Sequence, residues 1–169
     1  MVTEFRPETS GQPKHDERFS ILIADDDRGT RETLSDLLRD RGFHTVQAAD
    51  GGEAVEIVQV NLVHLVLFDM HMPRLSGLEA LNVLRQTLQR VLPAVLMSAD
   101  VTTELMRQAL QAQVYSVIPK PVNKNTVLYT LAKALEKVYG KLTNPEPTPA
   151  AAPRPTDHGK PTPTQETDR

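Results

Sequence analysis

Polar residues suited to phosphoryl-transfer chemistry follow four separate apolar segments of the sequence. They are Asp25 and Asp26 after segment 20–24, Asp69 after 65–68, Ser98 at the end of 93–98, and Lys120 after 115–118. A carboxylate can act as a nucleophile and form an aspartyl phosphate. A lysine and a divalent cation beside it would neutralise charge on the oxygens of the transferred group. This combination of residue types therefore predicts a phosphoryl-acceptor site.

Each of these residues also has an ordinary structural explanation when it is taken alone. An Asp after a strand is often a turn residue or a helix cap, and a lysine between two prolines is usually solvated. Their occurrence together, in this order at four segment ends, favours the functional interpretation. Two carboxylates about 4 Å apart near a protein surface repel by about 4 kcal/mol. A cation is therefore needed among them, and an all-oxygen ligand set that retains water predicts Mg²⁺ as the cofactor.

The elements that must position these groups are short apolar strands that alternate with amphipathic helices. The sequence predicts strands at 20–24, 44–48, 65–69, 93–98 and 115–118, each followed by a helix. Ser76 and Glu79 predict a capping box at the start of the helix after 65–69. Run 65–68 is continuously apolar, as in a strand that is covered on both faces. Five such units predict an α/β fold with an open parallel sheet and helices on both faces. All carboxyl ends of a parallel sheet lie on one side, so the polar groups can converge there.

Composition divides the 169 residues into three parts. Residues 1–18 have no periodic apolar pattern and predict a flexible lead-in. Residues 19–142 contain the alternating elements and predict one compact domain. Residues 143–169 are rich in Pro and Thr and contain almost no large apolar side chain, which predicts a disordered tail.

Overall charge and composition exclude several classes of protein. The net charge of −3 is too balanced to favour direct binding to nucleic acid. The absence of Cys excludes disulfides, thiolate nucleophiles and Cys-ligated zinc. No apolar run approaches the roughly 18 residues of a membrane span, and the N-terminus lacks the pattern of a signal peptide. A cytoplasmic protein is expected.

Together these motifs resemble the receiver domain of two-component response regulators, over about residues 19–141. The matching stretches are Ile21-Leu22-Ile23-Ala24-Asp25-Asp26-Asp27, Val66-Leu67-Phe68-Asp69-Met70-His71-Met72-Pro73, Ser76-Gly77-Leu78-Glu79, Met97-Ser98-Ala99 and Pro119-Lys120-Pro121. The resemblance implies a flavodoxin-like (CheY-like) doubly wound sheet of five parallel strands in the order 2-1-3-4-5, with five helices.

The resemblance also implies a role for each acidic residue of the site. Asp69 matches the phosphoacceptor, and it would also contribute to the metal site. Asp25 and Asp26 match the acidic pair that holds Mg²⁺ directly or through water. His71 stands where the family uses a backbone carbonyl as a metal ligand, so its imidazole has no required contact with the metal.

The remaining matches concern the switch between two forms of the domain. Ser98 matches the hydroxyl that contacts the phosphoryl group, Lys120 matches the contacting lysine, and the Lys120–Pro121 bond is cis in relatives. Val117 departs from the pattern, because the family usually has an aromatic ring there that turns inward. Tyr115 is a candidate substitute on the same strand face. The usual Gly before this strand is missing from 112–114, so a differently shaped loop is expected.

The sequence as a whole is typical of a single-domain response regulator that accepts a phosphoryl group on Asp69. The resemblance implies a histidine kinase or phosphotransfer protein as donor and an unidentified downstream protein as receiver of the signal. It implies no conventional enzyme, and it leaves dimerisation open. One alternative is a phosphorylation-independent scaffold. Another is an aspartyl-phosphate hydrolase with Asp25 as its nucleophile, which segment 25–30 loosely suggests.

Overall fold

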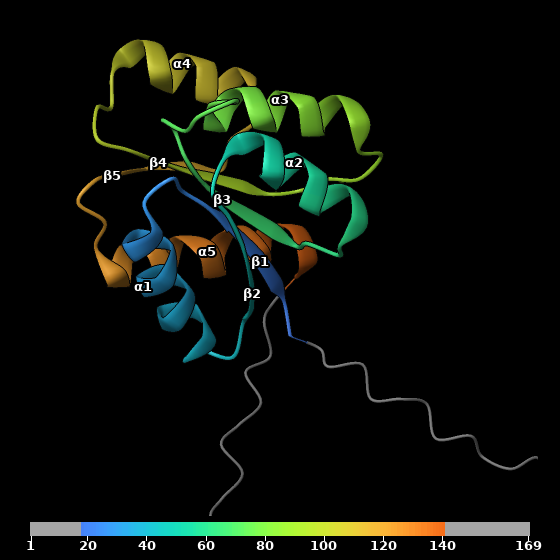
Figure 1. The fold of residues 1–169 in the computed structure, drawn as a ribbon, viewed down its shortest axis with the longest axis vertical. Coiled ribbons are helices and arrows are strands. Elements are labelled where there is room, and N and C mark those ends of the chain that lie inside the picture. The colour runs from blue at the N-terminus through green and yellow to red at the C-terminus, as the bar shows by residue number, and fades with distance from the viewer. Residues whose placement is uncertain (1–17, 141–169) are drawn as a thin grey trace, which may run out of the picture.

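The computed structural model describes residues 18–140, which form alternating strands and helices (Figure 1). In chain order they are β1 (Ser20–Ala24), α1 (Arg28–Arg39), β2 (His44–Ala48), α2 (Gly51–Val60), β3 (Leu65–Asp69), α3 (Gly77–Thr87), β4 (Ala94–Ser98), α4 (Thr103–Gln111), β5 (Ser116–Pro119) and α5 (Lys124–Tyr139). Apart from Arg18, the predicted lead-in (1–18) and the whole predicted tail (143–169) lie outside the described residues. None of the described helices is long and apolar enough to cross a membrane.

The five strands form one parallel sheet in the order β2-β1-β3-β4-β5. Strand β1 lies between β2 and β3, with its Leu22 in register with Val46 of β2 and Val66 of β3. After β1 the chain passes through α1 to β2 on one side of β1. It then crosses through α2 to β3 on the other side, so the direction in which strands are added reverses there. The predicted doubly wound α/β fold is therefore confirmed, and its switch point lies between β1 and β3.

Helices cover both faces of the sheet, and each face has its own core. Figure 1 shows α1 and α5 on one side and α2, α3 and α4 on the other. Alternate residues of each strand point to opposite faces. In β1, Leu22 and Ala24 pack in the core under α2 and α3, whereas Ile21 and Ile23 pack in the core under α1 and α5. Burial on both faces explains the continuous apolar strands.

Helix starts are fixed by local capping. The predicted capping box is present at α3: the Ser76 hydroxyl accepts from the Glu79 N–H, and the Glu79 carboxylate accepts from the Ser76 N–H. Asp27, Asp50, Thr102 and Asn123 are the N-caps of α1, α2, α4 and α5. These side chains satisfy the free N–H groups of each first turn, so each helix begins immediately after a loop at the carboxyl edge of the sheet.

Two strands begin one residue later than predicted. Strand β4 begins at Ala94 rather than at residue 93, because Pro93 has no N–H to donate to the ladder. Strand β5 begins at Ser116, so Tyr115 precedes it. Helix α4 begins at Thr103 and buries only Leu105 and Ala109 against the core. It is thus attached by few side chains.

Candidate functional site

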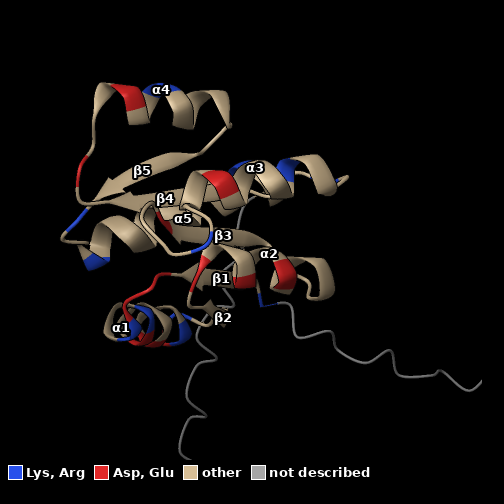
Figure 2. Cartoon of the chain, turned by 45° about the horizontal axis from the view of Figure 1, so that its top comes forward, with Lys and Arg blue, Asp and Glu red and all other residues tan. Residues whose placement is uncertain are grey.

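Four strands deliver the predicted polar residues to one edge of the sheet. Asp25 follows β1, Asp69 and Ser98 are the last residues of β3 and β4, and Lys120 follows β5. Figure 2 shows the acidic segment that joins β1 to α1 at this edge. The Lys120 N–H donates to the Ser98 carbonyl at 2.8 Å, which holds the lysine beside the end of β4. The structure therefore brings together residues that are up to 95 positions apart.

Asp25 is the most enclosed of the acidic residues. Its side chain has no exposed surface, yet both of its carboxylate oxygens have partners. The Asp27 N–H donates to Asp25 Oδ1 at 2.9 Å, and Lys120 Nζ donates to Oδ2 at 3.0 Å. Burial of a carboxylate is costly unless its oxygens have such partners. Arg31 also donates to the Asp25 main-chain carbonyl at 2.7 Å, so the first turn of α1 braces this residue.

Lys120 also pairs with Asp69, its Nζ lying 3.1 Å from Asp69 Oδ1. Asp69 is nearly buried, and this burial raises the pKa of its carboxyl group; the Lys120 hydrogen bond opposes the shift and the Asp25 charge adds to it. Burial disfavours the Lys120 ammonium, but the hydrogen bonds that it donates to Asp25 and Asp69 outweigh that effect and raise the pKa of Lys120. The lysine thus remains a cation shared by two carboxylates.

Three carboxylates in this cluster fit a hard divalent cation. Oxygen atoms of Asp25, Asp26 and Asp69 all lie within 4.8 Å of one another. Asp26 is exposed whereas the other two are buried, so the cluster opens to solvent on one side. Oxygen ligands on one side and water on the other match the preference of Mg²⁺. Lys120 contributes one positive charge beside these three carboxylates, so the remaining negative charge favours a bound cation.

Ser98 is buried at the site, but its hydroxyl is engaged within its own loop. The hydroxyl donates to the Asp100 carbonyl at 2.9 Å and accepts from the Asp100 N–H at 3.2 Å. Contact with a group on Asp69 would require the hydroxyl to leave these partners. Ser98 thus stands at the predicted edge of the sheet with a side-chain orientation that the sequence could not indicate.

The side chain of His71 is exposed, while its main chain faces the site. The His71 backbone N–H donates a hydrogen bond to the Asp69 carboxylate and lowers the pKa of that group, against the larger effect of burial. The main chain is thus the part of His71 that contacts the acceptor. That the His71 carbonyl is a metal ligand stays a prediction.

The departures from the family pattern have defined positions. Val117 is half-buried in β5 and packs against the core under α2, α3 and α4. Tyr115 lies outside the strand, and its ring is 5.7 Å from Lys137 Nζ on α5. It therefore does not occupy a strand position equivalent to Val117. Gln113 adopts the left-handed conformation with φ 56°, so the loop keeps a backbone conformation for which glycine is the usual residue.

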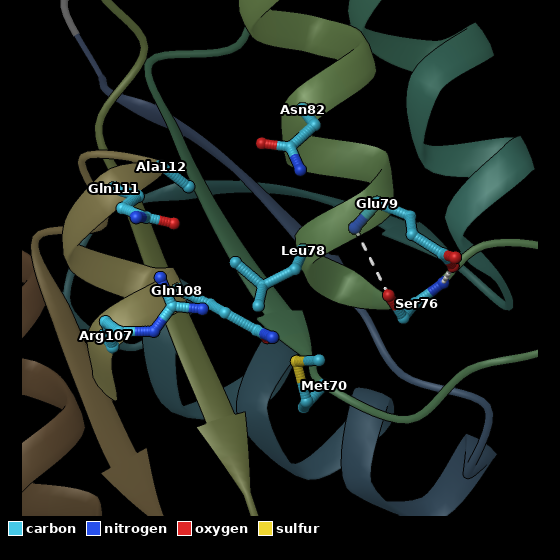
Figure 3. A pocket seen from close by; sticks show the side chains of 9 residues that line it. All are labelled: Met70, Ser76, Leu78, Glu79, Asn82, Arg107, Gln108, Gln111 and Ala112. Atoms are coloured by element: carbon cyan, nitrogen blue, oxygen red, sulfur yellow. Dashed lines mark hydrogen bonds between the residues drawn. The ribbon is translucent and has the colours of Figure 1, made fainter. Parts of the chain in front are cut away.

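A groove next to the site was not predicted from the sequence. It has a volume of about 510 Å³ and lies between α3 and α4, with Met70 at its end nearest the sheet (Figure 3). Leu78 of α3 and Gln108 of α4 face each other across it. Sequence patterns on two separate helices give no sign of such a gap.

Asp27 and Arg31 were likewise missed as supports of Asp25, although their positions in the first turn of a capped helix were recognisable.

Comparison with known proteins agrees with this geometry. The sequence profile described as the response regulator receiver domain matches residues 21–132. The chain belongs to the response regulator receiver domain family. Transcriptional regulatory protein PdtaR of Mycobacterium tuberculosis is 30% identical over 118 residues, which cover 69% of this chain and 57% of PdtaR. Sensor histidine kinase RcsC of Salmonella typhimurium is 30% identical over 132 residues, which cover 78% of this chain and 14% of RcsC.

Solved receiver domains have the same fold. The CheY-like response regulator receiver domain protein of Methanospirillum hungatei is 26% identical, with a TM-score of 0.68 over 71% of this chain and 95% of that one. The receiver domain of Francisella response regulator 1452 gives a TM-score of 0.67 at 24% identity, over 71% of this chain and 98% of that one. The chain spans only part of the curated relatives that it matches, about half of PdtaR and a seventh of RcsC. The similarity therefore concerns the receiver domain itself, which is a signalling domain.

Proposed function

We propose that this receiver domain accepts a phosphoryl group on Asp69 from a histidine kinase or a phosphotransfer protein. The observation that carries the proposal is the position of the Asp69 carboxylate, at the end of β3 and 3.1 Å from Lys120 Nζ. In the reaction the P–N bond to the donor's imidazole breaks and a P–O bond to an Asp69 oxygen forms. Lys120 would balance the charge that accumulates on the phosphoryl oxygens.

A magnesium ion is the proposed cofactor of this step. Asp25, Asp26 and Asp69 would hold it with their carboxylates, and the main-chain carbonyl of His71 is the further proposed ligand. The bound ion would supply neutralisation of the phosphoryl oxygens. Asp25 cannot easily turn away to leave the site, because the Asp27 N–H and Lys120 hold its two oxygens. It therefore presents a fixed carboxylate before any phosphoryl group arrives.

Ser98 and Ala99 are proposed to respond to phosphorylation. The Ser98 hydroxyl would exchange its Asp100 partners for a phosphoryl oxygen, and Ala99 is the small neighbour that leaves the acyl phosphate accessible. Two neutral hydrogen bonds would give way to one with a charged acceptor, which is about twice as strong as a neutral one. The exchange is thus nearly balanced, as a switch between two populated forms requires.

Output is proposed to occur through protein contact and not through binding to nucleic acid. Phosphorylation would add about one and a half to two negative charges at this edge of the sheet. The loop between β4 and α4 begins directly after Ser98, and α4 buries only Leu105 and Ala109. Movement of Ser98 would therefore shift a helix that few side chains restrain. A downstream protein would recognise the altered face around α4.

Labelling with a small phosphodonor tests the acceptor directly. Wild-type protein incubated with acetyl phosphate and Mg²⁺ should gain one phosphoryl group, which mass spectrometry should map to Asp69. The Asp69→Asn variant should gain none, whereas an exposed control, Asp36→Asn on α1, should label like the wild type. Wild-type protein that stays unlabelled would favour the scaffold alternative instead.

The same experiment separates the acceptor from the hydrolase alternative. A label on Asp25 that persists in Asp69→Asn would support a hydrolase with Asp25 as its nucleophile. The geometry opposes that reading, because Asp25 has no exposed surface and both of its oxygens accept hydrogen bonds. Asp69 is more accessible than Asp25, since its side chain is 6% exposed whereas that of Asp25 has no exposed surface.

A further inference from the structure

The loop of residues 70–76, which joins β3 to α3, is packed directly against the acceptor. Its first N–H, on Met70, donates to the Met97 carbonyl at 2.8 Å, and the Gly77 N–H donates back to the Met70 carbonyl at 3.1 Å. A Cβ atom on Gly77 would lie only 2.5 Å from the Asp69 carbonyl oxygen. The start of α3 therefore rests on the backbone of Asp69. Any change in the shape of this loop will displace groups around the acceptor.

The tip of the loop is a strained turn. Arg74 has φ 65°, and the Leu75 N–H donates to the Pro73 carbonyl two residues earlier at 2.8 Å. A positive φ with this hydrogen bond defines the rarer form of γ-turn, which is unfavourable for a residue with a side chain. Such a conformation persists only where the surroundings enforce it, and residues of this kind cluster at functional sites.

The start of α2 supplies that enforcement. Arg74 Nε and Nη2 lie 2.9 Å and 2.7 Å from Asp50 Oδ1, the oxygen that also caps α2 through the Glu53 N–H. A Cβ atom on Gly52 would lie 2.8 Å from the Arg74 guanidinium carbon. One on Gly51 would lie 2.3 Å from the Leu75 carbonyl oxygen. Figure 2 shows the basic segment of this loop beside the acidic start of α2.

We propose that Asp50 and Arg74 form a latch that fixes the 70–76 loop and thereby sets the metal affinity of the site and the lifetime of the phosphoryl group on Asp69. The inference rests on the proposed function. Neither residue touches the acceptor, so both are positioning residues. They act through His71, whose backbone N–H donates to the Asp69 carboxylate and whose carbonyl is the proposed metal ligand. A loop released at its tip would hold both groups less firmly.

The Arg74→Gly variant separates the latch from general stability. Glycine accepts a positive φ without strain, so the melting temperature should stay within about 2 °C of the wild type. Amide exchange over 70–76 should nevertheless become at least about threefold faster. The Mg²⁺ concentration for half-maximal labelling by acetyl phosphate should rise about two- to fivefold, the range expected for an exposed ion pair. The half-life of the phosphorylated form should change at least about twofold.

Asp50→Asn should act in the same direction, because it keeps the capping oxygen but removes the charge that holds Arg74. The double variant should be no worse than the more affected single variant, since both changes break one interaction. Arg107→Ala is the matched control: Arg107 is 55% exposed and paired with Glu104, as Arg74 is 54% exposed and paired with Asp50. It should leave amide exchange of the loop and phosphoryl lifetime unchanged.

Unchanged exchange and an unchanged phosphoryl half-life in Arg74→Gly would overturn the latch. Additive effects in the double variant would overturn it as well, because the two residues would then act separately. Wild-type protein that takes no label refutes the proposed function, and the amide exchange of the loop then decides alone whether Asp50 and Arg74 hold it. The two failures are thus distinguishable.

Discussion

Replacing Lys120 by methionine should destabilise the domain chiefly by leaving two carboxylates without a counter-charge. Methionine keeps a similar length and volume but cannot donate to Asp25 or Asp69, to which Lys120 Nζ lies 3.0 Å and 3.1 Å away. Removal of one partner from a buried ion pair costs about 3–5 kcal/mol. The Lys120 side chain is 25% exposed, so solvent screening reduces the expected loss to about 2–3 kcal/mol.

The pH dependence of this loss follows from the carboxyl groups. The pKa of Asp69 is already raised in the folded protein, mainly by burial, and loss of the lysine hydrogen bond should raise it further. A carboxyl group whose folded pKa exceeds its unfolded value binds more protons when folded, so it contributes stability at low pH that is lost as pH rises through the folded pKa. The difference between variant and wild type should therefore be largest near neutral pH and shrink on acidification.

Urea unfolding of both proteins between pH 7 and pH 4 measures these effects. Mg²⁺ should stabilise the variant more than the wild type, because a cation in the acidic cluster replaces the missing charge. Lys124→Met on exposed α5 surface is the control and should change stability by less than about 0.5 kcal/mol. A loss below about 1 kcal/mol that stays constant with pH would refute the view that Lys120 balances Asp25 and Asp69.

Two further predictions concern positions away from the acceptor. Burial and, to a lesser extent, the charge of Arg90 lower the pKa of His64, whose Nδ1 accepts from the Ser20 N–H at 2.9 Å while Tyr139 donates to its carbonyl. Because the unfolded chain then binds more protons, the free energy of unfolding should decline as pH falls below about 6.5. Urea titrations of His64→Asn should show a weaker decline with pH, and a decline equal to that of the wild type would contradict this. Gln113→Gly should raise stability by about 1 kcal/mol in thermal melts, since Gln113 has φ 56°; a loss would show that its side chain matters more than its backbone strain.

Local features of the sequence predicted the alternating elements and the parallel sheet, whereas the strand order came from the resemblance to the receiver family. Continuous apolar runs such as 65–68 predicted strands buried on both faces, and Ser76 with Glu79 predicted the start of α3. These inferences succeed because burial, capping and turn formation depend on residues close together in the chain. The same reasoning was less exact at Pro93 and Tyr115, where loss of a single ladder position moves a strand boundary without changing the apolar pattern.

The order of polar residues at strand ends also determined which side chains share one edge of the sheet, because parallel strands all end on the same side. Only the tertiary structure decided how those side chains are arranged. It placed Lys120 between Asp25 and Asp69, turned the Ser98 hydroxyl toward Asp100, and left the His71 imidazole exposed. These orientations depend on rotamers and on hydrogen bonds across the sheet, which have no local sequence pattern.

The contrast between sequence and tertiary structure is strongest in the loop that follows Asp69. In the sequence, the Asp-Gly-Gly segment at 50–52 and the Pro-Arg-Leu segment at 73–75 are separate, and no local pattern links them. Folding brings them together, because the missing side chains of Gly51 and Gly52 let the loop approach α2 closely enough for Arg74 to reach Asp50. The sequence determined the acidic acceptor and the sheet that carries it. Packing between elements 24 residues apart decided how its loop is held.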